Sequence, residues 1–411
     1  MTLAQKLVAR AAGRDSVTPG EIVTCKVDLA MMHDSGGPRR VKPMLERLGA
    51  KVWDPSKVVV ITDHYVPAYD DESRKIIRLA RDWVREAGID NFYDEQGICH
   101  VVLPERGHLR PGMFAVGGDS HSPTGGAFAA YMFGVGATEM LGVLVTGEIW
   151  LKVPHTIVMD FDGALERGVS AKDAMLFLIG RFGMDGGEYQ AVEYRGPAIR
   201  SLPMQERMTL CNMTAELGGQ TGLIASDETT AAYLGTKVET WESDVGAPVL
   251  AHHRFNASEL APQVAAPHSP ANAKPVDEFL SVKPTVAYIG ACTGAKLADL
   301  RMAASVLKGH KAKMRLMVAP ASARDVKAAE EEGTLAVLRD AGAEFLGLGC
   351  GICAGYGGNV LGENVVAIST TARNFKGRMG APSSQVFLAS PYTVAATAVA
   401  GRICDPRELL H

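Results

Sequence analysis

The amino-acid sequence predicts an α/β fold with mostly parallel sheets. Short runs rich in β-branched and apolar residues alternate with helical segments along the chain. This alternation is typical of parallel sheets that helices cover on both faces. Hydrophobic residues make up 47% of the 411 residues and charged residues 21%, as in ordinary globular proteins. A chain of this length exceeds what one hydrophobic core usually serves, so two to four domains are expected.

The first 280 residues alternate less regularly but still predict both strands and helices. Apolar runs at 57–63, 112–121 and 155–163 predict strands. Residues 73–88 predict an amphipathic helix, because their apolar side chains recur on one face and Gly88 ends the pattern. The basic N-terminal stretch fits either a transit peptide or a short helix that ends at Gly13. The helix is the favoured interpretation.

The most apolar stretch of the chain, residues 125–147, raises the question of a membrane span. It is long enough, since roughly 20 residues cross a bilayer. Glu139 and repeated glycines argue against a span, because a charge at that depth is costly. We therefore expect closely packed buried helices here and no association with a membrane.

A regular pattern begins after residue 280. Residues 255–279 are rich in Pro, Ala and Asn and predict a long irregular connection at a domain boundary. Beyond it, strands are expected at 285–290, 314–319, 344–349, 364–370 and 385–390. Helical segments separate these strands, and Ser322 is expected to cap one of them. The chain is thus expected to divide into two intertwined α/β lobes in residues 1–280 and a third α/β domain in residues 281–411.

Charge and cysteine content exclude several classes of protein. The formal net charge is −4 and no run of Lys or Arg occurs, so nucleic acid is not an expected partner. The seven cysteines are odd in number, and the chain starts without a secretory signal. A disulfide framework is therefore not expected. These features indicate a cytoplasmic protein whose thiols are reduced.

Polar side chains follow several of the predicted strands. Asp63 and His64 come after one strand, and Asp119, Ser120 and His121 come after another. Two predicted strands of the last domain are followed by Cys292 and by the pair Cys350 and Cys353. Because ligands bind beyond the carboxyl ends of parallel strands, these groups suggest one cleft that several strand ends face.

The stretch "GCGICAG" places Cys350 and Cys353 two residues apart between glycines. Such a pair fits a redox couple, half of a zinc site, two ligands of an iron–sulfur cluster, or two buried thiols in a tight turn. The glycine-rich tail is a poor helix start, which a redox couple needs. Cys292, in "IGACTG", supplies a third thiol. Three thiolates can hold a cluster and leave one iron open to substrate.

Seven motifs in order resemble the aconitase superfamily of hydro-lyases. The last domain contains "IGACTG", "GCGICAG" and "ARNFKGRMG", and the first 280 residues contain "ITDH", "GICH", "GGDSHSPTGGAF" and "CNMTAELGG". The likeness runs over nearly the whole chain. Within the superfamily, the chain most resembles the large subunits of 3-isopropylmalate dehydratase and of homoaconitases.

The resemblance implies three linked α/β domains around a central cleft and a 4Fe-4S cluster, one iron of which has no protein ligand. It implies the following roles. Cys292, Cys350 and Cys353 ligate the cluster; Asp63 and His64 protonate the leaving hydroxyl; His100 pairs with Asp119 and His121 with Glu216 around the open iron; Ser120 and Asn212 line the pocket; Arg373 and Arg378 hold substrate carboxylates. The expected reaction removes water from a small hydroxy-dicarboxylate, or adds it to the unsaturated partner.

The sequence departs from the family pattern at three positions. Ala291 and Gly294 stand where many members have Ser and Asn, and Ala372 stands where Asn is usual. These changes imply a less polar cluster environment, which leaves room for substrates other than citrate and isopropylmalate beside the leading interpretation, a dehydratase most like that of 3-isopropylmalate. Hydratases of maleate, citraconate and dimethylmaleate are therefore alternatives, as is a homoaconitase.

A catalytic base is missing from the expected site. In the family this base is a serine on a fourth, mobile domain, whereas Ser383 and Ser384 here are expected to serve a turn. The resemblance therefore implies a small subunit that carries the swivelling domain, in a heterodimer or heterotetramer. Two other classes remain as alternatives: a cluster-bearing regulatory or RNA-binding protein, and a zinc or redox protein.

Overall fold

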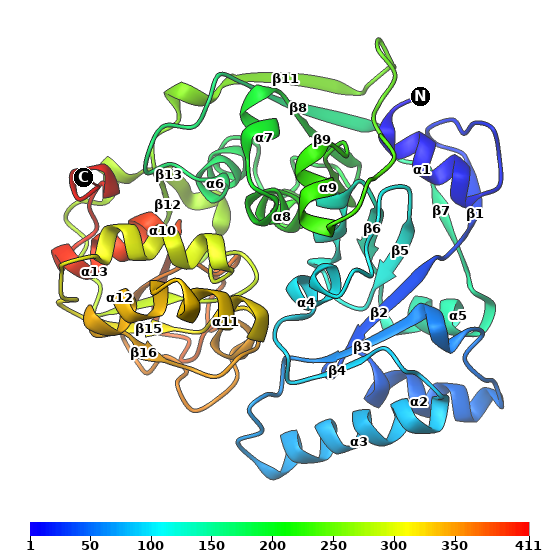
Figure 1. Ribbon diagram of the computed structural model, residues 1–411, viewed down its shortest axis with the longest axis horizontal. Helices are drawn as coiled ribbons and strands as arrows, with labels where there is room; N and C mark the ends of the chain where they lie inside the picture. Colours follow the sequence, from blue (N-terminus) through cyan, green and yellow to red (C-terminus); the bar gives the residue numbers. More distant parts are fainter. Residues whose placement is uncertain (411) are drawn as a thin grey trace.

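The computed structural model describes residues 1–410 and contains three sheets that are largely parallel (Figure 1). Helices accompany each sheet, so the predicted α/β fold is confirmed. A separate antiparallel pair is formed by β1 (Ile22–Lys26) and β7 (Glu148–Lys152). The division of the chain into domains at residue 280 stays a prediction.

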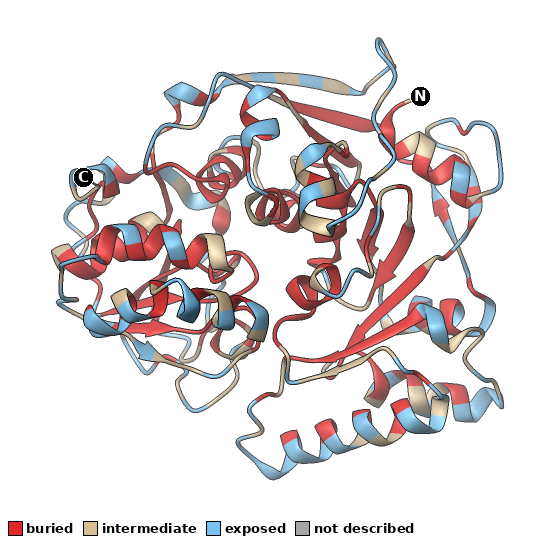
Figure 2. Cartoon of the chain, viewed as in Figure 1, coloured by how far each residue is buried: buried red, intermediate tan, exposed pale blue. Residues whose placement is uncertain are grey.

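The first sheet has five parallel strands in the order β4-β3-β2-β5-β6. Its strands are β2 (Leu29–His33), β3 (Val58–Thr62), β4 (Phe92–Asp94), β5 (Phe114–Gly117) and β6 (Tyr131–Gly134). The helices of this part are α1 (Leu3–Ala11), α2 (Pro38–Leu48), α3 (Asp71–Ala87), α4 (Cys99–Glu105), α5 (Ala137–Thr146) and the 3-10 helices η1 (Pro55–Lys57) and η2 (Ser122–Phe128). The inner face of α3 is buried and its outer face is exposed (Figure 2), as its sequence pattern predicts.

The second sheet has four parallel strands in the order β10-β9-β8-β11. These strands are β8 (Thr156–Asp162), β9 (Ala191–Arg195), β10 (Thr221–Leu223) and β11 (Ala251–Asn256). The helices between and after them are α6 (Ala171–Phe182), α7 (Pro197–Ser201), α8 (Met204–Met213), α9 (Glu228–Leu234) and η3 (Ala257–Glu259).

The third sheet has seven strands in the order β13-β12-β18-β17-β14-β15-β16. They are β12 (Gln263–Ala265), β13 (Ala273–Pro275), β14 (Val286–Ile289), β15 (Arg315–Val318), β16 (Glu344–Phe345), β17 (Val366–Ser369) and β18 (Gln385–Ala389). Its helices are α10 (Leu297–Leu307), α11 (Ala323–Glu331), α12 (Thr334–Asp340), α13 (Pro391–Ala400), η4 (Pro270–Asn272), η5 (Val276–Phe279), η6 (Gly351–Ala354) and η7 (Pro406–Glu408). As predicted, Ser322 caps α11 by accepting the N–H of Asp325.

Two expectations about irregular and apolar segments are wrong. Residues 255–279 are not one irregular connection, because β12 pairs antiparallel with both β13 and β18 and extends the third sheet. Residues 125–147 are not only helical, since the buried strand β6 separates η2 from α5. A short, fully buried apolar run has no period that distinguishes a strand from a helix. Ala129, in the left-handed conformation at φ 53°, ends η2 and allows β6 to begin.

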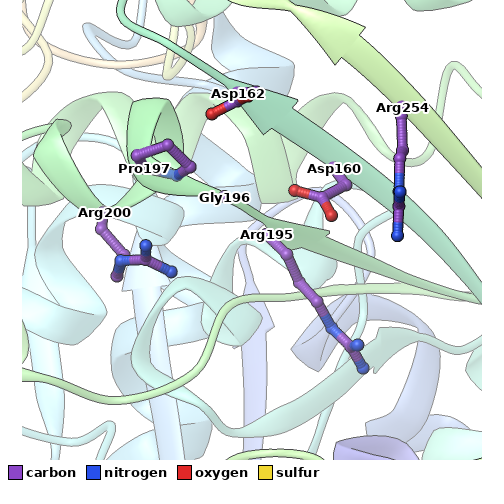
Figure 3. Close-up of a pocket in the computed structure, with 7 residues that line it drawn as sticks. All are labelled: Asp160, Asp162, Arg195, Gly196, Pro197, Arg200 and Arg254. Atoms are coloured by element: carbon purple, nitrogen blue, oxygen red, sulfur yellow. The ribbon is translucent and has the colours of Figure 1, made fainter. Parts of the chain in front are cut away.

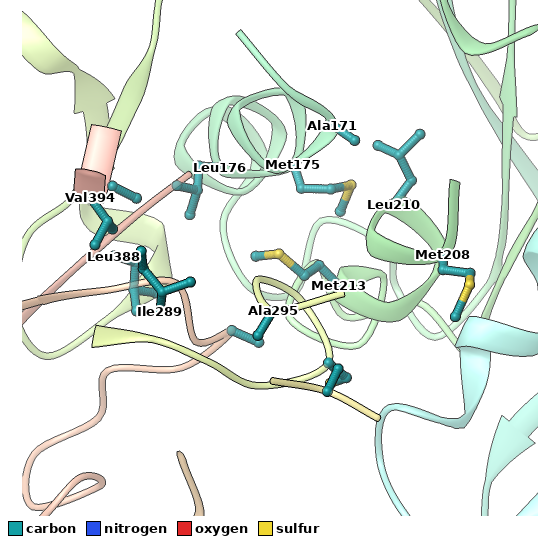
Figure 4. Packing of buried hydrophobic residues seen from close by; sticks show 14 of the residues in the cluster. Ala171, Met175, Leu176, Met208, Leu210, Met213, Ile289, Ala295, Leu388 and Val394 are labelled. Atoms are coloured by element: carbon teal, nitrogen blue, oxygen red, sulfur yellow. The ribbon is translucent and has the colours of Figure 1, made fainter. Parts of the chain in front are cut away.

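A continuous hydrophobic core joins the second and third sheets (Figure 4). Side chains from α6 and α8 pack there against residues of β14, β18, α13 and the turn after β14. The labelled members are Ala171, Met175, Leu176, Met208, Leu210, Met213, Ile289, Ala295, Leu388 and Val394. Because α6 follows β8 of the second sheet and contacts β12, β13 and β18, this helix links the second and third sheets.

The close approach of η2 to β10 at Gly126 yields a stability prediction. A Cβ atom at this position of η2 would lie 1.6 Å from the carbonyl oxygen of Gly222 in β10. We expect Gly126→Ala to destabilise the fold by about 3 kcal/mol, because the backbone on both sides must shift. Urea unfolding followed by circular dichroism measures this change.

A matched control lies nearby at Gly142 in α5. A Cβ atom there meets nothing within 4 Å, so Gly142→Ala is expected to stabilise the protein by about 0.5–1 kcal/mol through helix propensity. Equal unfolding midpoints for the two variants would contradict the proposed contact between η2 and β10.

Candidate active site

Asp63 and His64 lie together at the carboxyl end of β3. His64 Nδ1 is 2.6 Å from Asp63 Oδ1, so the ring N–H donates to the carboxylate. Asp63 Oδ2 accepts the backbone N–H of Cys99 at 2.7 Å, at the start of α4. The carboxylate is completely buried. These contacts fix the orientation of the His64 ring. Its Nε2 atom takes no part in the hydrogen bond to Asp63.

His33 and Asp34, at the end of β2, support this pair and were not among the predicted site residues. The His33 ring stacks on the His64 ring with centroids 4.0 Å apart. Asp34 accepts the backbone N–H groups of Asp63, His64 and Tyr65 at 3.1, 3.0 and 2.7 Å. The sequence carried a signal for them, because "MMHD" follows an apolar strand in the same way as "ITDH".

The charges of these groups follow from burial and pairing. Burial lowers the pKa of His64, but the charge and hydrogen bond of Asp63 outweigh it and raise that pKa to about 10. Burial raises the pKa of Asp63, yet His64 holds it well below its usual range. Burial and the neighbouring His64 charge lower the pKa of His33. At neutral pH the pair is therefore an imidazolium beside a carboxylate, and His33 is neutral.

A second chain of contacts begins at Asp119, after β5. Its Oδ1 atom lies 2.7 Å from His100 Nε2 and accepts the backbone N–H of His121 at 2.8 Å. Its Oδ2 atom is 3.8 Å from His64 Nε2. Although burial raises the pKa of Asp119, the neighbouring histidines lower it well below the ordinary value. Asp119 therefore connects the His64 pair to His100 and His121.

Glu216, after α8, holds the far side of this network. His121 Nε2 lies 2.8 Å from Glu216 Oε1, and Arg373 Nε donates to the same oxygen at 2.5 Å. Burial raises the pKa of Glu216, but His121 and Arg373 outweigh it and lower that pKa. Three buried atoms around this network have no hydrogen-bond partner within residues 1–410: Asn212 Oδ1, Glu216 Oε2 and Arg378 Nε. They retain hydrogen-bonding capacity for a ligand.

The three predicted cysteine ligands lie at the strand ends of the third sheet. Cys292 follows β14, Cys350 follows β16, and Cys353 lies within η6. All three are buried free thiols. The backbone N–H of Cys350 donates to the carbonyl oxygen of Asp63 at 2.7 Å, which ties the cysteine turn to β3. Asn212 Nδ2 donates to Cys292 Sγ at 3.2 Å.

The electrostatic environment favours a thiolate at this turn. A hydrogen bond from Cys350 lowers the pKa of Cys353 to about 5, against the effect of burial, and Arg378, His121 and Arg373 lower it further. The same hydrogen bond and burial raise the pKa of Cys350 well above its ordinary value. Burial raises the pKa of Cys292 to about 12. Cations around a thiolate fit an anionic metal–thiolate group, whose ligands bind as thiolates.

The predicted residues thus lie around one network. Two details bear on how they are interpreted. Ser120 is exposed beside Asp119, and no hydrogen bond of its side chain is found within residues 1–410. Cys350 and Cys353 lie in a 3-10 turn and not at the start of an α-helix, which weakens the redox-pair interpretation. The remaining cysteines are separately buried thiols: Cys25, Cys99, Cys211 and Cys404.

A separate surface pocket of about 430 Å³ lies at the ends of β8, β9 and β11 (Figure 3). Its lining consists of charged residues and a Gly-Pro turn: Asp160, Asp162, Arg195, Gly196, Pro197, Arg200 and Arg254. It shares no residue with the network described above. The predicted residues therefore mark a different place from this pocket.

Comparison with known proteins agrees with the motif pattern. The model of the aconitase family (aconitate hydratase) matches residues 5–401. The chain belongs to this family. Its resemblance to hydro-lyases is thereby confirmed, and the chain is an enzyme of that class. Membership implies an iron–sulfur cluster, and the three buried thiols fit one.

Curated relatives match over the whole chain. The 3-isopropylmalate dehydratase large subunit 1 of Methanopyrus kandleri is 43% identical over 100% of this chain and 99% of its own length. A probable methanogen homoaconitase large subunit of Methanosarcina mazei is 45% identical over 93% of this chain and 99% of its own length. A crystal structure of Thermococcus kodakaraensis aconitase X has a TM-score of 0.50 at 13% identity and covers 85% of this chain and 84% of its own. That likeness concerns the fold alone.

The departures from the family pattern have a structural counterpart at Gly294. A Cβ atom there would lie 2.1 Å from the Cβ of Thr370, so the Thr370 side chain fills the space that a larger residue would need. Thr370 Oγ1 instead bridges the N–H and carbonyl oxygen of Gly290 at 2.8 and 2.9 Å. Ala372 is buried at 1% exposure.

Among the helices of residues 1–410, none combines the length and the apolar composition that a bilayer crossing requires. The stretch at 125–147 in particular is divided between η2, β6 and α5.

The Asp63–His64 pair predicts an unusual titration. In the apo protein His64 is expected to stay protonated at pH 8, where an ordinary imidazole with a pKa of about 6.5 is neutral. Because the folded-state pKa exceeds the unfolded one, this contact stabilises the fold fully below about pH 6.5 and ceases to do so as the pH passes about 10. NMR titration of ¹⁵N-labelled histidines measures it, and His64→Gln assigns the resonance.

Asp63→Asn is the matched variant for this titration. Without the Asp63 carboxylate, burial is opposed only by the weaker charge effects of Asp119 and Asp34, so the pKa of His64 should fall well below about 10. A His64 pKa near 6.5 in the unchanged protein would contradict the assigned pairing.

Proposed function

We propose that this chain is the cluster-bearing large subunit of a dehydratase that acts on a small hydroxy-dicarboxylate, most like 3-isopropylmalate. The observation that carries the proposal is the convergence of three buried thiols with the Asp63–His64 pair and two arginines. Removing water from such a substrate needs an acid for the hydroxyl and cations for the carboxylates, and both lie beside the thiols. The three sheets would then correspond to three domains around the cleft.

Cys292, Cys350 and Cys353 would hold a 4Fe-4S cluster with one iron that has no protein ligand. Bound there, the cluster supplies a Lewis acid for the substrate hydroxyl. Three features of the chain support this assignment: the thiols are buried, Asn212 donates to Cys292 Sγ, and the pKa of Cys353 is lowered to about 5, largely by Cys350 and then by Arg378 and His121.

His64 is the proposed acid. Its Nδ1 is engaged with Asp63, so Nε2 is the atom that donates a proton to the departing hydroxyl. The proton is present at neutral pH because Asp63 raises the pKa of His64 to about 10. After donation, the neutral ring keeps its hydrogen bond to Asp63, and the reverse reaction returns the proton. His100 and His121 are oriented by Asp119 and Glu216.

Arg373 and Arg378 are the proposed carboxylate ligands. Arg373 uses only its Nε on Glu216 in the contacts found, and Arg378 Nε is buried without a partner within residues 1–410. A planar guanidinium can hold a carboxylate with two parallel hydrogen bonds. Two such groups suit a dicarboxylate. Ser120 and Asn212 would line the same pocket.

The base that removes the carbon-bound proton is proposed to come from a separate small subunit with a swivelling domain. Both serines considered for the role are engaged in a turn: Ser383 binds Glu363, and Ser384 donates to the carbonyl oxygen of Ala381 at 2.7 Å. The relatives from Methanopyrus kandleri and Methanosarcina mazei are named large subunits. A heterodimer or heterotetramer in the cytoplasm follows from this proposal.

The alternative substrates are homoaconitate-type acids, citraconate, maleate and dimethylmaleate. Two observations favour keeping them. A methanogen homoaconitase large subunit is as similar as the dehydratase subunits, and neither Gly294, two residues after Cys292, nor Ala372, next to Arg373, has a polar side chain. Hydratase assays across these unsaturated diacids, with the anaerobically reconstituted chain and its small subunit, distinguish them.

Cys353→Ser tests the ligand assignment. We expect loss of iron, and loss of activity when the small subunit is present, with the fold retained, because a three-thiolate cluster cannot lose one corner. Two measurements give the result. One is the iron content, and the other is the absorption of the anaerobic protein at roughly 400 nm, where thiolate-bound clusters absorb. Cys404→Ser is the control and should keep both. About four irons per chain in Cys353→Ser would refute the assignment.

The chain alone is expected to lack turnover after anaerobic reconstitution of the cluster. The reason is the missing base, so adding the small subunit should restore activity. The assay follows hydration of the diacid panel with and without that subunit. Full turnover by the lone chain would refute the partner proposal and would point to Ser383 or Ser384.

A further inference from the structure

Lys172 is a buried lysine that the network above does not use. It is the second residue of α6, and its side chain is 1% exposed. Its Nζ atom donates to the carbonyl oxygen of Thr371 at 2.7 Å, to that of Thr370, and to Thr293 Oγ1 at 3.3 Å. The three acceptors are themselves fully buried.

These acceptors belong to the two turns that carry proposed site residues. Thr293 follows Cys292 after β14, while Thr370 and Thr371 follow β17 and precede Arg373. Thr293 Oγ1 donates to the carbonyl oxygen of Thr370 at 2.9 Å and closes the arrangement. One ammonium on a helix of the second part thus fixes two adjacent strand ends of the third sheet.

The charge of Lys172 has no ion-pair partner. Within residues 1–410, no carboxylate oxygen lies within 4.0 Å of its Nζ, whereas the neighbouring buried Lys296 has Asp299 Oδ2 at 2.7 Å. Burying an unpaired ammonium is costly. Accordingly, burial lowers the pKa of Lys172 to about 7, opposed by Asp299, aided by the charge of Lys296, and opposed again by Cys353 and Cys292. An additional anion close to Cys292 and Cys353 would supply the missing counter-charge of Lys172.

We propose that Lys172 is the buried counter-ion of the iron–sulfur cluster and the residue that positions the Cys292 and Arg373 turns around it. The inference rests on the proposed function, since it assumes a cluster on the three thiols. A cluster with thiolate ligands is anionic, so loading it would supply the charge that Lys172 lacks. Lys172 touches neither substrate nor thiol and acts only through the two turns and through its charge.

A fixed positive charge beside a cluster has a defined effect. It favours the electron-rich state, because net charge and hydrogen bonds around a cluster set its reduction potential. In a low-dielectric interior this effect is larger than in water. Lys172 should therefore raise the potential and slow oxidative loss of the cluster in air.

Three substitutions separate charge from hydrogen bonding. Lys172→Met removes both, Lys172→Gln keeps a donor without charge, and Lys172→Arg keeps the charge. The readouts are the potential of the anaerobically reconstituted cluster, measured by EPR-monitored titration, and the rate at which the visible absorption bleaches in air. We expect a lower potential and severalfold faster bleaching in the Met and Gln variants, and values near those of the unchanged protein in the Arg variant.

The outcomes separate the inference from the proposed function. Failure of the unchanged protein to bind a cluster refutes the proposed function itself. Clusters in the Met and Gln variants with unchanged potential and bleaching overturn the counter-ion role. If the apo variants melt at a lower temperature while the cluster potential and the bleaching rate stay unchanged, Lys172 has a structural role only, and the counter-ion role is overturned. Failure of Met and Gln variants to retain a cluster, with apo folds that melt normally, supports the inference.

Discussion

The geometry of the site depends on Asp63, whose oxygen atoms contact the adjacent His64 and two segments that are distant in the sequence. Oδ1 holds His64 Nδ1 at 2.6 Å, Oδ2 accepts the N–H of Cys99 at 2.7 Å, and the carbonyl oxygen accepts the N–H of Cys350 at 2.7 Å. This one residue thereby joins β3, the start of α4 and the cysteine turn. Gly349 permits the approach, because at φ +128° a Cβ atom would lie 2.6 Å from the Asp63 carbonyl oxygen.

Largely buried carboxylates, each with its own hydrogen-bond partners, continue the network beyond that residue. The carboxylates of Asp119 and Glu216 lie between histidines and Arg373. Each carboxylate is stable in the interior only because its partners are present, since an uncompensated buried charge is strongly destabilising. The network therefore holds its side chains in position before substrate arrives, which is what acid catalysis and carboxylate binding require.

Sequence patterns found most of this site because they follow strand ends. Asp63, Asp119, Cys292 and Cys350 each come directly after an apolar run, and parallel strands bring their carboxyl ends to one edge. His33 and Asp34 follow the same rule but belong to no motif that the resemblance included. Lys172 has no such signal, because one lysine near the start of an apolar helix is usually solvent-exposed. The strands β6 and β12 were missed because short apolar or proline-rich runs have no distinctive period.

The sequence by itself determined the α/β class, most of the strands and helices after residue 280, and which side chains are proposed for the site. These depend on local periodicity, caps and motifs, which neighbouring residues specify. Only the tertiary structure decided which of those side chains meet. His121 contacts Glu216 across 95 positions and Asn212 contacts Cys292 across 80. Such contacts depend on the order of strands within each sheet and on the packing of α6 and α8 against the third sheet, and no local stretch of sequence encodes either.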